Sequence, residues 1–149
     1  MKKLLFTIFI FFSLFLGHSQ SSNYNTYKGF GAKGYDVVAY FDNEAVKGHE
    51  QYSTTYKEVV YKFSSQEHLM RFKSQPERFL PQYGGYCAYA VALKSEKVDI
   101  NPKAFEIRDG KLYLFYNAWG TNTLKLWQKN NVKGLQHKAD QNWEAMILE

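Results

Sequence analysis

The sequence predicts a single α+β domain in which a small antiparallel sheet packs against several short helices. Its length of 149 residues suits one domain. Hydrophobic residues make up 45% of the chain and aromatic residues 18%, which is enough for a packed core and excludes a disordered chain. Short runs with strand-like alternation occur in both halves, and stretches with helical spacing lie between and after them.

Residues 1–19 are typical of a secretory signal peptide. Lys2 and Lys3 precede an apolar run over residues 4–16, and small residues follow it. The run is shorter than the roughly 20 residues that span a bilayer. We therefore expect cleavage after Ser19, export to the periplasm or the extracellular space, and no stable membrane insertion of the mature chain. An uncleaved membrane anchor is the alternative.

The charge and the cysteine content exclude several classes of site. The net charge is +5, but the expected signal peptide removes two lysines, and the remaining basic residues are scattered. A nucleic-acid-binding surface normally needs a denser basic stripe, so we expect no nucleic-acid partner. The single cysteine, Cys87, allows neither an internal disulfide nor a multi-cysteine zinc site.

The first half of the mature chain predicts a polar lead and three strands. Residues 20–33 are polar and contain glycines, which is typical of a flexible lead, so the domain is expected over residues 34–149. Apolar and β-branched runs predict strands over residues 36–41, 52–57 and 59–63. Their short connections favour an antiparallel meander.

Helical spacing begins after the third strand. Ser64 and Glu67 have the spacing of an N-terminal capping box, and they predict a helix over residues 65–74. Residues 76–80 predict a further helical turn that opens with a proline. The alanine-rich segment predicts another helix over residues 85–94.

The last third predicts a hairpin and two helices. Residues 104–108 and 111–116 alternate in polarity, and the Asp-Gly pair between them is a strong signal for a tight hairpin turn. Apolar spacing predicts a helix over residues 121–128, with Thr121 as its cap, and a last helix over residues 135–148.

Cys87 is the first candidate site residue. At the start of a helix that begins near Gly85, its sulfur would lie at the positive end of the helix dipole, which favours the thiolate. Thiolates bind metals and react with oxidants, and Tyr83 could donate a hydrogen bond to the sulfur. The alternative is that Cys87 is a small buried side chain among alanines.

His68 and the tyrosines are the other candidates. His68 lies in the first turn of the predicted capped helix, and a pair of Cys87 and His68 would suit copper or zinc. A structural role for His68 is the alternative. Tyr83, Tyr86 and Tyr40 could line a pocket for a small ligand, or they could pack in the core. Sequence patterns of serine hydrolases, phosphate-binding loops and paired catalytic carboxylates are lacking, so we do not expect an enzyme.

Three segments together resemble the YHS domain family, in particular its exported single-domain branch. They are GYDVVAYF at residues 34–41, the stretch from VVYKF to GGYCAYAVA at residues 59–92, and DGKLYLFYN at residues 109–117. The resemblance implies metal binding, which is the role most often suggested for this family. In similar proteins selenocysteine sometimes replaces the cysteine of the GGYCAY segment, which implies chemical use of Cys87.

The resemblance is incomplete at the cysteine ligands of metal-linked members. Ala39, Ser64 and His68 stand at the three ligand positions, so two thiolates are lacking and only His68 could bind a metal. The resemblance therefore implies an exported metal-binding or thiol-redox accessory protein, with Cys87 as ligand or reactive centre and His68 as helper. The alternative is a non-catalytic module with a tyrosine-rich surface and a buried Cys87 that binds a small ligand or a protein.

Overall fold

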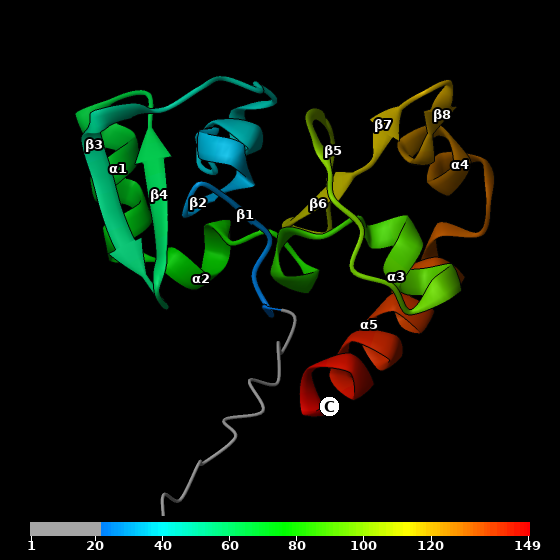
Figure 1. Cartoon of the computed structure of the whole chain (residues 1–149). Coiled ribbons are helices and arrows are strands. Elements are labelled where there is room, and N and C mark those ends of the chain that lie inside the picture. Colours follow the sequence, from blue (N-terminus) through cyan, green and yellow to red (C-terminus); the bar gives the residue numbers. More distant parts are fainter. Residues whose placement is uncertain (1–21) are drawn as a thin grey trace, which may run out of the picture.

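The computed structural model describes residues 22–149 and confirms the α+β fold class (Figure 1). A small sheet with two helices lies on the left of Figure 1, and a hairpin with three further helices lies on the right. The expected signal peptide, residues 1–19, lies outside the described residues. None of the helices in residues 22–149 is both long enough and apolar enough to cross a membrane.

The left-hand sheet has four strands in the order β1-β2-β4-β3. They are β1 (Thr26–Tyr27), β2 (Phe30–Gly31), β3 (His49–Tyr56) and β4 (Val59–Phe63). The hairpin of β3 and β4 confirms two of the predicted strands. β2 pairs with β4 in parallel, so the sheet is mixed and not purely antiparallel as expected.

The segment expected to be a flexible lead belongs to the domain. It contains β1 and β2, and it ends in the short 3-10 helix η1 (Ala32–Gly34). Asn25 holds it in place, since its backbone N–H donates to the Gly84 carbonyl at 2.8 Å and its side chain donates to the Gly85 carbonyl at 3.1 Å. The polar composition of the lead gave no indication of these distant backbone partners.

The predicted strand over residues 36–41 is wrong. The chain instead forms the 3-10 helix η2 (Ala39–Asp42). The Asp36 carboxylate causes the bend, because its Oδ1 accepts hydrogen bonds from the backbone N–H groups of Val38 at 2.9 Å and Ala39 at 3.1 Å. Such local bonds from side chain to backbone compete with strand pairing.

Helices α1 (Gln66–Ser74) and α2 (Pro76–Phe79) confirm the two helical predictions after β4. The cap of α1 is shifted by one residue from the expected capping box. Ser65 caps the helix by accepting the backbone N–H of His68 at 3.1 Å. The neighbouring Ser64 instead donates its hydroxyl hydrogen to Asp36 Oδ2 at 2.7 Å.

The right-hand half holds the predicted hairpin and the longest helix. The hairpin consists of β5 (Asn101–Arg108) and β6 (Lys111–Phe115). Helices α3 (Ala88–Lys94), α4 (Thr123–Lys129) and α5 (Val132–Leu148) gather beside it, and α3 contacts both of the others (Figure 1). The expected cap Thr121 is wrong, because Asn122 caps α4 by accepting the N–H of Lys125 at 3.2 Å.

Two clusters of buried side chains form the core. The first joins the left-hand sheet to Cys87 and Leu112, and the second joins α3, α4 and α5 around Trp127. Tyr89 packs against both clusters. A short 3-10 helix, η3 (Tyr83–Gly85), precedes α3 and carries the chain from one cluster to the other.

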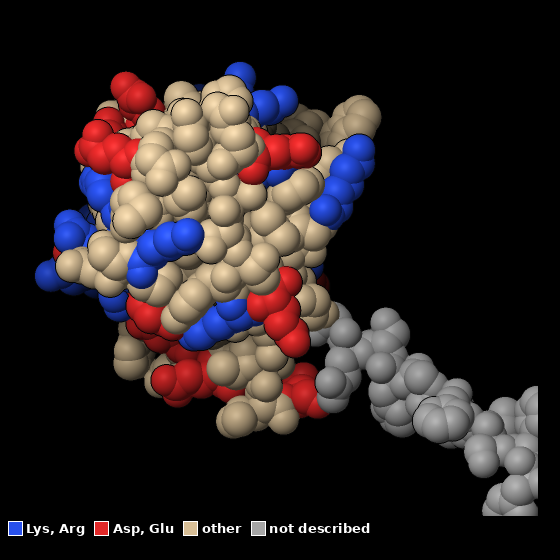
Figure 2. Space-filling view, turned by 90° about the vertical axis from the view of Figure 1, so that its left-hand side faces the viewer, with Lys and Arg blue, Asp and Glu red and all other residues tan. Residues whose placement is uncertain are grey.

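The face on the left of Figure 1 carries charges of both signs. Figure 2 shows acidic and basic side chains interspersed there, without a broad patch of one sign. Opposite charges also pair in this half of the protein, such as Lys57 with Glu77 at 2.6 Å and Lys62 with Glu50 at 3.3 Å. This mixture agrees with the scattered charge along the sequence and indicates a solvated surface.

An unexpected feature is the tight turn between β7 (Asn117–Ala118) and β8 (Thr121–Asn122). Its two residues, Trp119 and Gly120, have φ angles of 51° and 78°, and the Trp119 side chain is 96% exposed. A two-residue turn with both φ angles positive favours Asn-Gly, and a bulky residue at its first position is strained.

Replacing Trp119 with Asn therefore stabilises the protein, by about 0.5–1 kcal/mol. Loss of the exposed indole removes little packing, and Asn adopts left-handed backbone angles more readily than Trp does. Denaturant unfolding of Trp119→Asn measures the gain, and Trp119→Phe, which keeps the strain, serves as the control. A loss of stability in Trp119→Asn would show that the indole makes a stabilising contact.

Candidate functional site

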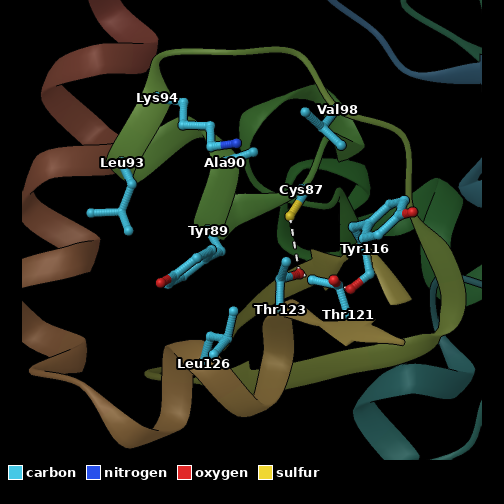
Figure 3. A pocket seen from close by; sticks show the side chains of 10 residues that line it. All are labelled: Cys87, Tyr89, Ala90, Leu93, Lys94, Val98, Tyr116, Thr121, Thr123 and Leu126. Carbon is cyan, nitrogen blue, oxygen red and sulfur yellow. Dashed lines mark hydrogen bonds between the residues drawn. The ribbon is translucent and has the colours of Figure 1, made fainter. Parts of the chain in front are cut away.

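A pocket of about 350 Å³ opens beside Cys87 (Figure 3). One wall comes from the start of α3 through the loop that follows it, with Cys87, Tyr89, Ala90, Leu93, Lys94 and Val98. The facing wall comes from the chain between the end of β6 and the middle of α4, with Tyr116, Thr121, Thr123 and Leu126. Most of these side chains are apolar or aromatic, and the two walls are far apart in the sequence.

Cys87 lies at the inner end of this pocket. It is the N-cap residue of α3 and not part of its first turn, which corrects the expected position. Its backbone N–H donates to the Val98 carbonyl at 2.9 Å, and its side chain is completely buried. Gly84 turns the chain just before it with a φ of 61°, where a Cβ would collide with the Asn23 carbonyl.

The side chain of Cys87 has a hydrogen-bond partner inside the protein. Cys87 Sγ lies 3.3 Å from Thr123 Oγ1, and Thr123 Oγ1 lies 2.8 Å from the Tyr116 carbonyl, to which it donates (Figure 3). Either atom of the Cys87–Thr123 contact can supply its hydrogen. Cys87 is thus a buried side chain with a partner, as the alternative interpretation expects.

The mouth of the pocket is lined by longer side chains. Leu93 and Leu126 are exposed to 48% and 38%, although both are large and apolar. Tyr89 forms a side of the pocket and its hydroxyl points away from Cys87, while Lys94 contributes the one charged group of the lining (Figure 3). The pocket thus has a largely apolar and aromatic lining with a single charged group, Lys94.

His68 lies in a different environment, next to the buried Asp36. His68 Nδ1 donates to Asp36 Oδ2 at 2.7 Å, because an ionised carboxylate can only accept. On its other side, His68 Nε2 lies 3.6 Å from the carboxylate of Asp42, which also pairs with Arg71 at 3.2 Å. These contacts fasten α1 to η2, which is a structural role.

The structure does not join Cys87 and His68 through a shared partner. The hydrogen bond of the cysteine side chain goes to Thr123, and those of the histidine ring go to Asp36 and Ser64. Within residues 22–149 there is no group of three or more His, Cys, Asp or Glu side chains placed to hold a metal ion. Copper or zinc binding by this pair stays a prediction.

The three tyrosines proposed for ligand binding each donate to the protein itself. Tyr40 donates to the Pro102 carbonyl at 2.7 Å, Tyr83 to Asp140 at 2.9 Å and Tyr86 to the Ser22 carbonyl at 2.8 Å. Burial raises the pKa of each of these phenols, so they remain neutral donors. None of the three lines the Cys87 pocket, and Tyr83 does not reach the sulfur as a donor.

Several pocket residues were not identified from the sequence. Thr123 and Leu126 were seen only as part of a predicted helix, and Lys94 only as a scattered charge. Tyr89 was not among the candidate tyrosines named from the sequence; it lies in α3, whereas Tyr83 lies in η3. The spacing of residues within each segment carries no information about which segments face each other, so the pocket had no sequence signal.

The function must be argued from this geometry. The resemblance to the YHS domain family, carried by the segments at residues 34–41, 59–92 and 109–117, stays a prediction. In comparisons with known proteins, no family model, no curated protein and no solved structure matches the chain.

Proposed function

We propose that this protein binds a compact, mainly apolar molecule in the Cys87 pocket, as an exported, non-catalytic YHS-like module. The observation that carries the proposal is an open pocket of about 350 Å³ with a largely apolar and aromatic lining. Small-molecule sites typically have this kind of lining and volumes of about 300–1,000 Å³. The volume equals that of on the order of ten water molecules at about 30 Å³ each, so the ligand is small.

The inner end of the pocket favours an apolar part of the ligand. The sulfur of Cys87 and the hydroxyl of Thr123 form a hydrogen bond with each other, and the Thr123 hydroxyl donates to the Tyr116 carbonyl. Because these polar groups already have partners, a polar ligand atom would have to displace an existing hydrogen bond. An apolar group displaces only water there.

Burial argues against Cys87 as a metal or redox centre. Reactive cysteines lie at partly exposed positions, whereas Cys87 is completely buried and contacts Thr123. Binding of copper or zinc would require loss of this hydrogen bond and a second ligand from outside the described contacts. The binding module is therefore the better supported of the two hypotheses.

A variant that fills the pocket tests the proposal. Ala90 is buried and lines the pocket, so the larger side chain in Ala90→Leu occupies the ligand's space. We expect 1-octanol to shift the backbone amide resonances of α3 and α4 in the native protein, and its affinity to fall about tenfold or more in Ala90→Leu.

Ala118→Leu is the matched control. Ala118 is half-buried and lines a neighbouring, more polar pocket, but it does not line the Cys87 pocket. This variant should bind 1-octanol like the native protein. If octanol moves resonances over the whole surface alike, or if both variants bind it equally well, the Cys87 pocket is not the binding site.

A further inference from the structure

The lining of the Cys87 pocket carries one positive charge. Lys94 is the last residue of α3 and lines the pocket. Figure 3 shows its side chain turned back toward Ala90, one helical turn earlier, and not away from the pocket. Among residues 22–149, Lys94 takes part in none of the ion pairs, whereas Lys33, Lys57 and Lys62 each have a carboxylate partner.

The charge of Lys94 stands in a pocket whose lining is otherwise uncharged and largely apolar or aromatic. The ammonium lies beside Ala90, whereas the hydroxyl of Tyr89 points away from Cys87 on another side of the pocket (Figure 3). A molecule that matches this lining has an apolar body and one polar head placed near Lys94.

We infer that the ligand of this pocket is a small amphipathic carboxylic acid, whose carboxylate pairs with Lys94; the inference rests on the proposed binding function. A carboxylate head forms a charge-assisted hydrogen bond with an ammonium group, which a neutral head cannot match. A cationic head would be repelled by the same group. An apolar body of moderate length fits a pocket of about 350 Å³.

A lysine at the position of Lys94 also has a simpler explanation, and the test must distinguish that explanation from ligand binding. A lysine in the last turn of a helix is stabilised by the negative end of the helix dipole. Lys73 occupies the corresponding place in the last turn of α1, and it is equally exposed to solvent. Lys73 does not line the Cys87 pocket. Both lysines therefore lie at a helix end, but only Lys94 can contact a ligand in the pocket.

Three probes of equal length test the head group. Titration with octanoate, octanamide and octylammonium, by calorimetry and amide chemical shifts, compares an anionic, a neutral and a cationic head on one apolar body. For the native protein we expect octanoate to bind about fivefold more tightly than octanamide, since an exposed ion pair contributes up to about that factor. Octylammonium should bind most weakly, and added salt should reduce the preference for octanoate.

Variants at the two helix ends complete the test. Lys94→Gln should bind octanoate and octanamide equally, and Lys94→Glu should prefer octylammonium, while Lys73→Gln should keep the native preference. Equal binding of octanoate and octanamide by the native protein, or an equal loss in Lys73→Gln, would overturn the carboxylate assignment and leave the apolar pocket standing. Failure of all three probes to bind would overturn both proposals.

Discussion

Replacing Asp36 with Asn lowers the free energy of unfolding by about 3–5 kcal/mol, because several buried donors lose a carboxylate acceptor, at about 1–3 kcal/mol each. Asp36 is completely buried, and its two oxygens accept from three backbone N–H groups, a hydroxyl and an imidazole. Asn can keep one oxygen toward Val38 and Ala39, but its amide group then meets Ser64 and His68. The backbone N–H of Ser64 can only donate, so it faces the amide hydrogens of Asn without an acceptor.

Asp42→Asn is the matched control for this prediction. Asp42 belongs to the same network, with Nε2 of His68 at 3.6 Å and Arg71 at 3.2 Å, but its side chain is 49% exposed. Exposed ion pairs contribute at most about 1 kcal/mol, so this variant should lose little stability. Equal losses in the two variants under urea denaturation would show that burial of Asp36 is not the source of its contribution.

The hydrogen bonds of Asp36 also show why the sequence predicted some parts of the fold correctly and others not. Both main hairpins and all five α-helices of residues 22–149 follow from patterns within a few residues, such as the Asp-Gly turn between β5 and β6. The prediction of a strand over residues 36–41 rested on the strand propensity of its valines, and it was wrong. The bonds that overrule this propensity reach partly to Ser64 and His68, which are 28 and 32 positions away along the chain.

The candidate site was predicted in part for a comparable reason. The sequence singled out Cys87, and the structure places it at the inner end of a pocket. Its partner Thr123 is 36 positions away, so the sequence could not show that Cys87 is buried beside it. The position near a helix start favoured a thiolate and a metal, and the apolar pocket formed by α3 and α4 could not be foreseen.

Replacing Trp127 with Ala removes the centre of the second core cluster and lowers the free energy of unfolding by about 3–5 kcal/mol. The indole is completely buried, and its ring centroid lies 5.6 Å from that of Tyr113 and 5.4 Å from that of Phe115. The same substitution at Trp119, which is 96% exposed, is the control and should change stability by less than about 0.5 kcal/mol. Similar losses at both positions would contradict the assignment of Trp127 to the core.

Trp127→Phe separates the packing of this side chain from its hydrogen bond. Trp127 Nε1 donates to Glu106 Oε2 at 3.0 Å, and Phe keeps an aromatic ring but no donor, so we expect a loss of about 1–2 kcal/mol at neutral pH. Burial raises the pKa of Glu106, but hydrogen bonds from Arg108, Gln128 and Trp127 outweigh it and hold the pKa below its usual value.

A carboxylate whose pKa is lowered by folding stabilises the protein above its unfolded-state pKa, and this contribution is lost as the pH falls through the lowered value. The difference in stability between native protein and Trp127→Phe should therefore narrow when the pH is lowered from about 7 to about 3. The deficit of Trp127→Ala should largely persist, because lost packing does not titrate. Urea denaturation at the two pH values measures both, and a Trp127→Phe deficit that stays constant would mean that the charge of Glu106 does not strengthen the bond.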